Sequence, residues 1–419
     1  MDRIVITGGR PLKGCVRIGG AKNAALPIMA SCLLGGGDCV IGNVPRVRDV
    51  ATMNALLSLL GVSVRMEGTQ LILNASAVTQ TAAPYELVKT MRASVLVLGP
   101  LLARFGEAEV SLPGGCAIGT RPVNLHLKGL AALGADIRLE YGYIRARAPR
   151  LRGGCIDFDL PTVTGTENLM MAACLAKGTT VIRNAAREPE IVDLARFLTK
   201  RGARIYGAGT DTITIEGVER LHGAEHRVIP DRIEAGTYLM AGAITGGEVH
   251  VRECEALHLG TVLSKLREVG VEIREEPQAV TAVGPRRLQA VEVKTLAYPG
   301  FPTDLQAQIM AVMCLANGTS VVTETIFDAR FLHVPELQRM GACIEVESAS
   351  AVIRGVASLT GAPVMASDLR ASAGLVLAGL AAQGQTEISR VYHLDRGYEQ
   401  LEEKLSSLGG DVRRVAGAA

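Results

Sequence analysis

The apolar and polar positions along the chain follow a phrase that recurs six times: Leu-x-x-x-Gly, a small residue, any residue, then an aliphatic residue. A leucine-bearing run that ends in glycine and continues into aliphatic residues is typical of a helix with a glycine C-cap, followed by a strand. Successive glycines of the phrase lie 73, 68, 68, 71 and 68 residues apart, which indicates repeated structural units. These glycines are Gly61, Gly134, Gly202, Gly270, Gly341 and Gly409.

A second phrase falls between these, in which a run of small apolar residues is followed by glycine and a short Val/Ile/Thr-rich run. Each unit of about seventy residues therefore predicts a helix, a strand, a second helix and further strands. Six such units predict an α/β protein with three units per domain, in which alanine-rich and glycine-rich helices pack closely against sheets. The second phrase spans residues 25–41, 94–111, 169–182, 238–251, 305–322 and 375–388.

Length and composition narrow the class of protein. A chain of 419 residues exceeds what one hydrophobic core usually supports, so two domains are expected. A net charge of +2, six Phe, eight Tyr and no Trp give no basic surface or stacking platform for nucleic acid. The longest apolar runs are shorter than the roughly 18 residues of a membrane span, and the N-terminus reaches glycine and charge before a signal-peptide core could form. A cytoplasmic location is expected.

The nine cysteines show neither Cys-x-x-Cys pairs nor a disulfide framework, and the seven histidines show no metal-binding spacing. We therefore expect no metal and no cofactor. Cys174 and Cys314 lie in apolar helix-like runs and are interpreted as core residues. Cys116 differs, because residues 111–124 form a Gly/Pro-rich loop and Arg121 is close in sequence, conditions that favour thiolate chemistry.

Polar residues gather just before each of the six small-residue helices. Helix N-caps are one interpretation of the Asx and Thr residues among them. Capping does not account for Lys22, Arg92 and Arg370, because a cation at a helix N-terminus opposes the helix dipole, whereas a bound anion would resolve that conflict. The candidate caps are Asn23, Thr166, Thr303 and Asp368.

The loops after the second phrase carry further charges, among them Asp328, Arg330 and His333. Charged loop residues are most often solvated or form surface ion pairs. Arg46, Arg48 and Arg390 are assigned to that class.

Eight motifs, in order along essentially the whole chain, resemble those of the UDP-N-acetylglucosamine 1-carboxyvinyltransferases, which are bacterial cytoplasmic enzymes that commit the nucleotide sugar to peptidoglycan synthesis. They are Gly-Gly-Ala-Lys22-Asn23-Ala-Ala-Leu-Pro, Met-Arg92-Ala-Ser, Pro-Gly-Gly-Cys116-Ala-Ile-Gly-Thr-Arg121-Pro, Thr-Val-Thr-Gly-Thr-Glu-Asn, Asn-Ala-Ala-Arg-Glu-Pro-Glu, Pro-Asp-Arg-Ile-Glu-Ala-Gly-Thr, Phe-Pro-Thr-Asp304-Leu-Gln-Ala-Gln and Asp395-Arg396-Gly-Tyr-Glu.

The resemblance implies two similar domains, each an inside-out α/β barrel of three repeated units. One domain would be discontinuous, with residues 1–21 joining residues 230–419, and residues 22–229 would form the other. The repeats alone predict six units but not this arrangement of the chain.

The resemblance also implies the reaction, which transfers the enolpyruvyl group of phosphoenolpyruvate to the 3-hydroxyl of UDP-N-acetylglucosamine and releases phosphate. Lys22, Arg121 and Arg396 match the positions that hold phosphoenolpyruvate, and Arg92 is a candidate for the diphosphate. Cys116 matches the proton donor, which can form a covalent adduct with phosphoenolpyruvate and is alkylated by fosfomycin. Asp304 matches the carboxylate that accepts the sugar hydroxyl proton, although a plain N-cap is an alternative for it.

Further positions match the sugar-nucleotide site of the family. One departs from the family pattern, which often reads Arg-Pro-Val-Asp, because this chain has Asn124 and so keeps hydrogen-bonding capacity without the charge. Asp368 and Arg370 match residues that support the anion site. The matching sugar-nucleotide positions are Asn23, Arg121, Pro122, Val123, Asn124, Leu125, Thr162, Val163, Asp304 and Ile326.

Two alternatives stay open at this point. The first is the sister activity on shikimate 3-phosphate, whose enzymes lack the cysteine-bearing loop; the second is a binding module for a nucleotide sugar or polyanion without catalysis. In either enzyme reading the partners are small-molecule substrates, and no nucleic acid, membrane or obligate protein partner is expected.

Overall fold

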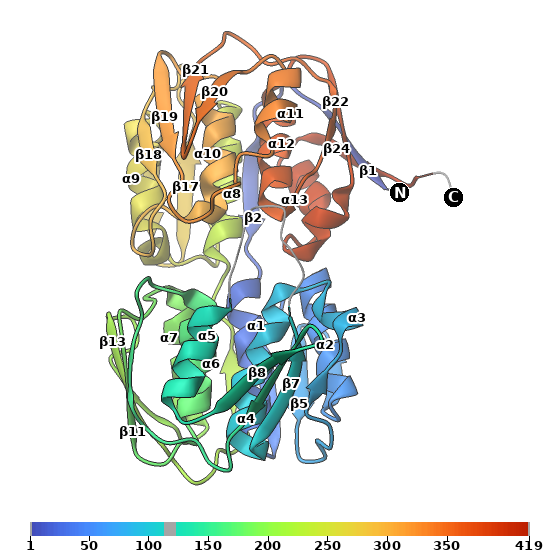
Figure 1. Cartoon of the computed structure of the whole chain (residues 1–419). Coiled ribbons are helices and arrows are strands. Elements are labelled where there is room, and N and C mark those ends of the chain that lie inside the picture. The colour runs from blue at the N-terminus through green and yellow to red at the C-terminus, as the bar shows by residue number, and fades with distance from the viewer. Residues whose placement is uncertain (1, 113–122, 418–419) are drawn as a thin grey trace. The chain divides into compact units, whose positions relative to one another are not determined.

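The structure is a computed structural model that describes residues 2–112 and 123–417 (Figure 1). The chain divides into two compact units, of which unit 1 holds residues up to Gly19 together with those from Pro230 onward. Unit 2 holds the described residues from Gly20 to Ile229. Each unit has its own hydrophobic core, and each is described by itself.

Unit 2 is built from helices and strands that alternate along the chain. Its helices are α1 (Lys22–Ser31), η1 (Cys32–Leu34), α2 (Arg48–Leu59), α3 (Tyr85–Val88), η2 (Arg92–Val97), α4 (Leu98–Phe105), α5 (Asn124–Ala132), α6 (Val163–Ala173) and α7 (Pro189–Lys200). Its strands are β3 (Asp38–Gly42), β4 (Ser63–Glu67), β5 (Gln70–Asn74), β6 (Ala82–Ala83), β7 (Glu107–Ser111), β8 (Asp136–Glu140), β9 (Tyr143–Arg147), β10 (Cys155–Asp157), β11 (Thr179–Arg183), β12 (Arg204–Tyr206), β13 (Thr212–Glu216) and β14 (Glu225–Arg227).

Unit 1 repeats this plan. Its helices are α8 (Arg232–Ile244), η3 (Ala256–Leu259), α9 (Gly260–Glu268), η4 (Thr303–Leu305), α10 (Gln306–Met313), α11 (Val334–Arg339), α12 (Leu369–Ala381), η5 (Val391–Arg396) and α13 (Leu401–Ser407). Its strands are β1 (Arg3–Thr7), β2 (Lys13–Arg17), β15 (Glu248–Arg252), β16 (Glu272–Glu276), β17 (Ala279–Val283), β18 (Glu292–Lys294), β19 (Thr319–Thr323), β20 (Cys343–Glu347), β21 (Ser350–Arg354), β22 (Pro363–Met365), β23 (Gln385–Ser389) and β24 (Asp411–Val415).

The described strands form four-stranded sheets, three in each unit. In unit 2 the strand orders are β14-β3-β5-β4, β6-β7-β9-β8 and β10-β11-β13-β12. In unit 1 they are β16-β17-β15-β2, β18-β19-β21-β20 and β22-β23-β1-β24. The N-terminal strands complete two sheets of unit 1, since β2 pairs with β15 in parallel and β1 lies between β23 and β24 with Ile4 opposite Ile388.

The glycine of the first phrase ends a helix in all six repeats, as predicted. Each of these glycines has a positive φ, between 91° and 103°, and each is followed by a strand. L-amino acids with a side chain rarely adopt such angles, so glycine is the residue that this turn favours.

The helices of the second phrase form the core of each unit. In unit 1 the buried helices α8, α10 and α12 pack against one another, and β15 alternates exposed and buried residues with its buried face toward α8. A Cβ atom added at Gly236 of α8 would lie 2.5 Å from Leu305 Cδ1, which explains why small residues are needed there. The result is a helical core with sheets around it. Within the part of the chain that the structure describes, no helix combines the length and apolar character of a membrane span.

Candidate active site

Asp304 of unit 1 lies in η4, at the point where a loop turns into the buried helix α10. Its side chain caps neither helix: Pro302 precedes η4, Leu305 precedes α10, and neither position shows a side-chain capping bond. The N-cap alternative for Asp304 is therefore wrong. The Asp304 side chain keeps 25% of its surface exposed and is held by cations instead.

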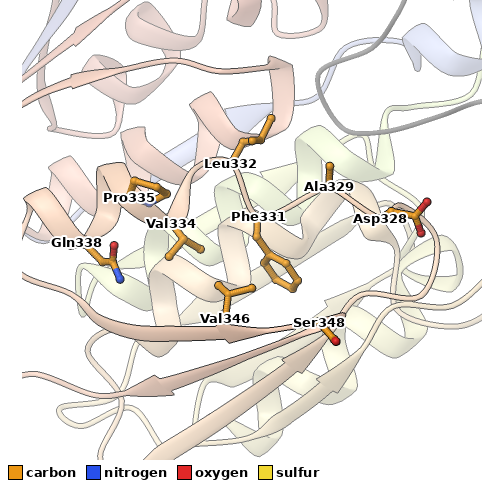
Figure 2. A pocket seen from close by; sticks show the side chains of 9 residues that line it. All are labelled: Asp328, Ala329, Phe331, Leu332, Val334, Pro335, Gln338, Val346 and Ser348. Atoms are coloured by element: carbon orange, nitrogen blue, oxygen red, sulfur yellow. The ribbon is translucent and has the colours of Figure 1, made fainter.

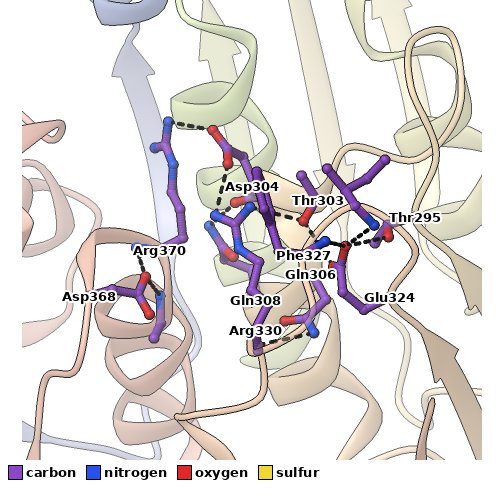
Figure 3. Close-up of polar contacts among 12 residues, drawn as sticks. Thr295, Thr303, Asp304, Gln306, Gln308, Glu324, Phe327, Arg330, Asp368 and Arg370 are labelled. Carbon is purple, nitrogen blue, oxygen red and sulfur yellow. Dashed lines mark hydrogen bonds and ion pairs between the residues drawn. The ribbon is translucent and has the colours of Figure 1, made fainter. Parts of the chain in front are cut away.

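Two arginines bind the Asp304 carboxylate, one through each oxygen (Figure 3). Arg330 Nη2 donates to Oδ1 at 2.8 Å, and Arg370 Nη2 donates to Oδ2 at 3.1 Å. Both guanidinium side chains are buried, with 6% and 4% of their surface exposed. Charge-assisted hydrogen bonds of this kind fix the orientation of a carboxylate and favour its ionised form.

Asp368 and Arg370 lie at the start of helix α12, on either side of its first residue. Asp368 Oδ1 accepts hydrogen bonds from the backbone nitrogens of Arg370 and Ala371, so it is the N-cap of the helix. Burial alone would lower the pKa of Arg370, but the charges of Asp304, Tyr398 and Asp231 outweigh it and raise the pKa above its ordinary value. Arg370 is therefore a permanent cation beside Asp304.

The N-cap interpretation is confirmed for Asp368 and is wrong for the other three candidates. Asn23 lies inside α1 after an N-cap at Ala21, and Thr166 lies inside α6, where its hydroxyl accepts from Ala186 N at 3.0 Å. The Thr303 hydroxyl contacts two side chains, those of Glu324 and Arg330. The residue types at a helix start do not determine the exact residue at which the helix begins, so sequence alone does not identify the cap.

The other candidates of unit 1 lie in loops and at helix ends. Ile326 is 40% exposed, and its backbone nitrogen donates to Glu324 Oε1 at 2.8 Å. Arg396 is the last residue of η5, which also contains His393. Burial and, second, the charge of Arg396 lower the pKa of His393, although the charge of Asp368 acts in the opposite direction.

In unit 2, Lys22 is the first residue of α1 and carries a buried ammonium group. Its Nζ lies 3.1 Å from Oδ2 of Asp49, a buried residue of α2. The conflict between a cation and the helix dipole is thus eased within the protein at Lys22 by Asp49, as it is at Arg370 by Asp304.

His126 of unit 2 directly follows Val123, Asn124 and Leu125 in sequence and connects α5 to α6. Its Nδ1 lies 3.0 Å from Asn168 Nδ2, and its Nε2 lies 3.3 Å from Thr164 Oγ1. An amide nitrogen can only donate, so Nδ1 accepts and Nε2 carries the proton of a neutral imidazole. Burial, followed by the charge of Arg92, lowers the pKa of His126 to about 4, which agrees with this neutral form.

Two further sugar-nucleotide candidates of unit 2 lie at the start of α6, the helix that His126 contacts. Thr162 is the N-cap of α6, with Oγ1 accepting from Gly165 N at 3.2 Å, and Val163 follows it. Asn168 of the same helix donates to Val95 O in η2, the element that Arg92 begins. Cys116, Arg121 and Pro122 lie outside the described residues.

In unit 1, a hollow of about 420 Å³ lies beside the loop that carries Arg330, and none of the candidate site residues lines it (Figure 2). Its wall includes Asp328, Ala329 and Phe331, which flank Arg330 in sequence, together with Val346 across the hollow. Arg330 is not among the lining residues. The loop therefore lines the hollow with Asp328, Ala329 and Phe331, and its arginine contacts Asp304 instead.

Sequence reasoning did not select four residues that the structure adds to the candidate site. Arg330 was noted only as a loop charge, and Glu324, Asp49 and His126 were not singled out. None of the four lies within one of the eight motifs, and their partners lie 21 to 42 residues away in the chain. Among the residues that the structure describes, no group of three or more His, Cys, Asp or Glu could hold a metal ion.

The chain is similar to known carboxyvinyltransferases over nearly its whole length. The sequence profile of the EPSP synthase (3-phosphoshikimate 1-carboxyvinyltransferase) family matches residues 6–405. UDP-N-acetylglucosamine 1-carboxyvinyltransferase from Geotalea uraniireducens (strain Rf4) is 58% identical over 415 residues, which cover 99% of this chain and 100% of the relative. The enzyme of that name from Anaeromyxobacter sp. (strain Fw109-5) is 59% identical over 419 residues, covering 99% of both chains.

Solved structures agree with the fold. The enolpyruvyl transferase NikO from Streptomyces tendae superposes with a TM-score of 0.90 at 26% identity, covering 100% of this chain and 99% of NikO. EPSP synthase from Acinetobacter baumannii gives a TM-score of 0.78 at 17% identity, covering 99% and 100% of the two chains, a likeness that concerns the fold alone. The expected inside-out α/β fold class is confirmed.

Proposed function

Because the chain belongs to the carboxyvinyltransferase family, as one of the UDP-N-acetylglucosamine 1-carboxyvinyltransferases, we propose that it transfers the enolpyruvyl group of phosphoenolpyruvate to the 3-hydroxyl of UDP-N-acetylglucosamine. The observation that carries this proposal is the 56–59% identity to enzymes of that name over nearly the full chain. The ion-paired carboxylate of Asp304 gives the reaction a group that can accept a hydroxyl proton.

The reaction is an addition followed by an elimination. The sugar oxygen forms a bond to C2 of phosphoenolpyruvate while C3 takes a proton, and then C3 loses a proton as the bond from C2 to the phosphate oxygen breaks. Asp304 accepts the hydroxyl proton in the first step. An ionised aspartate is a weak base toward an alcohol, so proton transfer is concerted with the attack on C2.

The roles of the other residues follow the same scheme. Lys22, Arg121 and Arg396 bind the carboxylate and phosphate of phosphoenolpyruvate, and Arg92 binds the diphosphate of the nucleotide. Cys116 supplies the proton to C3 and carries the covalent adduct with phosphoenolpyruvate.

Further residues contact the nucleotide sugar in this proposal. Asn124 contacts the uracil through hydrogen bonds without the charge of an aspartate. Asp368 caps α12 and so places Arg370. The remaining sugar-nucleotide contacts are made by Asn23, Arg121, Pro122, Val123, Leu125, Thr162, Val163 and Ile326.

In the cell, this reaction is the first committed step of peptidoglycan synthesis, and it takes place in the cytoplasm. Its loss would impair cell-wall growth, cell shape and division. No cofactor and no obligate protein partner is required.

Phosphate release from phosphoenolpyruvate tests the proposal against both alternatives. We expect release with UDP-N-acetylglucosamine and none with shikimate 3-phosphate. Release only with shikimate 3-phosphate would assign the sister activity. Binding of the nucleotide sugar without release would assign a binding module, and either result would overturn the proposal.

A further inference from the structure

Glu324 is a buried carboxylate directly after strand β19, with 3% of its surface exposed. Within the described residues it makes no ion pair, and it accepts four hydrogen bonds instead (Figure 3). Burying a charge is costly unless hydrogen bonds compensate it. Only a carboxylate can accept at four positions without presenting a donor, so the acidic side chain is matched to this place.

One oxygen of Glu324 leads to Asp304 through Thr303. Glu324 Oε2 lies 2.8 Å from Thr303 Oγ1, and since the carboxylate can only accept, the threonine hydroxyl donates. The lone pairs of that hydroxyl then accept from Arg330 Nη1 at 2.9 Å. The second branch of the same guanidinium, Nη2, binds Asp304 Oδ1. Glu324, which can only accept, fixes the direction of the first bond, and Arg330, which can only donate, fixes the direction of the other two.

The other oxygen of Glu324 holds the loop that carries Ile326. Oε1 accepts from the backbone nitrogens of Ile326 at 2.8 Å and Phe327 at 3.2 Å, and from Thr295 Oγ1 at 2.9 Å. Phe327 places its ring 5.1 Å from the guanidinium carbon of Arg330, a cation–π distance. Both carboxylate oxygens therefore lead to Arg330, by independent routes.

We infer that Glu324 is a positioning residue for the transfer reaction: it orients Arg330, and through it the Asp304 carboxylate, and it fixes the backbone at Ile326. This inference rests on the proposed function, in which Asp304 takes the sugar hydroxyl proton and Ile326 contacts the nucleotide sugar. Glu324 touches neither substrate; it acts through Thr303 and through the loop.

Glu324→Gln tests the inference with little change of shape. The amide NH2 takes the place of one carboxylate oxygen, so either the bond from Thr303 is reversed or the three bonds to the other oxygen are lost or reversed. We expect kcat to fall by about tenfold to a hundredfold, as for a small misplacement of a catalytic group, and KM for UDP-N-acetylglucosamine to rise severalfold. The matched control is Glu345→Gln, an exposed carboxylate of the same unit that pairs with Arg354, and it should leave both constants unchanged.

A double-mutant cycle with Thr303→Val asks whether Glu324 acts through Thr303. We expect the kcat loss of the double variant to be no greater than that of the more impaired single variant, because both substitutions break one chain of bonds. Thr303→Ser keeps the hydroxyl and should lose less activity than Thr303→Val. If Glu324→Gln does not fold, the comparison of Thr303→Ser with Thr303→Val still decides the matter.

Three results would overturn the inference: kcat and KM of folded Glu324→Gln within twofold of the parent, additive losses in the cycle, or equal activity of the two Thr303 variants. Failure of the proposed function looks different, since the parent protein itself would then release no phosphate with UDP-N-acetylglucosamine, and the positioning role would fall with it.

Discussion

At the scale of residues, Asp304 is defined by its two arginines. The two guanidinium groups orient the carboxylate, so in the proposed reaction they determine the position of the group that accepts the proton. This agrees with a concerted transfer, in which the hydroxyl proton moves as the new bond to carbon forms.

Replacing Asp304 with Asn should remove the proton acceptor while keeping the shape of the side chain. We expect kcat to fall by about 10²- to 10⁴-fold, the usual range for loss of a general base. The amide leaves two buried arginines with a weaker acceptor, so the unfolding midpoint in urea should also decrease. Steady-state phosphate release measures the change in kcat, and circular dichroism in urea measures the change in the unfolding midpoint. A variant with unchanged kcat would show that Asp304 is not the proton acceptor.

Cys116 should be the cysteine that fosfomycin alkylates. Four others are poor competitors because burial raises the pKa of Cys174 and Cys314 to about 12 and that of Cys254 to about 11, and raises the pKa of Cys32 as well. The hydrogen bond with Cys32 lowers the pKa of Cys39 to about 6, but Cys39 is buried and so is shielded from a reagent in solution. A thiol must ionise to attack an epoxide. Intact mass and peptide mapping should locate one adduct at Cys116 with loss of activity, and Cys116→Asp should take up none; an adduct elsewhere would count against the assignment.

His126 should make unit 2 sensitive to mild acid. Its folded pKa of about 4 lies below the ordinary value of 6.5, so the unfolded chain binds an extra proton between these values and stability is lost as the pH falls from 6.5 toward 4. Unfolding free energy from urea titrations should drop by about 1 kcal/mol per such histidine between pH 7.5 and 5.5.

His126→Gln should reduce the loss of unfolding free energy between pH 7.5 and 5.5 by the contribution of one histidine, about 1 kcal/mol, because glutamine does not titrate. His333 of unit 1, whose pKa burial also lowers to about 4, should account for part of the slope that remains. An unchanged slope in the variant would show that His126 does not carry the effect.

At the scale of elements, one helix ending is used six times. Each repeat closes its outer helix with a glycine at positive φ and continues into a strand, so the same local geometry serves six different sequences. At five of the six glycines an added Cβ atom would meet nothing closer than 3.7 Å, so the cost of a side chain there should be backbone strain rather than collision; at Gly61 it would also lie 2.9 Å from Ala77 O.

Gly409→Ala isolates this strain, because a Cβ atom at Gly409 would meet nothing within 4 Å although φ is +91°. We expect a loss of about 1 kcal/mol in the free energy of unfolding. The matched control in the same unit is Gly260→Ala, at an exposed helix start with open space and no positive φ. That variant should be neutral or more stable by about 0.4–1 kcal/mol, and equal losses in both would exclude a conformational cause.

At the scale of the whole molecule, the chain path determines which part can fold alone. All strands of the three sheets of unit 2 lie within residues 20–229. Two sheets of unit 1, by contrast, need strands from the N-terminus, β1 and β2. We propose these units as the two domains of the protein.

A fragment of residues 20–229 should therefore fold cooperatively with native-like circular dichroism. A fragment of residues 230–419 lacks β1 and β2 and should expose unpaired edges on two sheets, so it should aggregate or remain partly unfolded. Adding residues 1–19 through a linker should restore its folding. A stable fragment 230–419 would show that the N-terminal strands are dispensable.

The sequence by itself determined what depends on local patterns. The six repeats, their glycine caps and the small-residue helices follow from spacing and backbone preference, and these are properties of short segments. The same locality explains the correct expectation that Cys174 and Cys314 are core residues, since each lies within an apolar run and is fully buried. The errors at Asn23 and Thr166 arise because local composition does not determine the exact residue at which a helix begins.

Only the tertiary structure decided which charges meet. Lys22 pairs with Asp49, and Asp304 joins Arg330 with Arg370, across 26 to 66 residues of chain. It also showed that Glu324 accepts the hydrogen bond of the Thr303 hydroxyl, which in turn accepts from Arg330. Ion pairs and hydrogen bonds act over a few ångströms in space and leave no periodic trace in sequence, so the fold must bring their partners together before they can be identified.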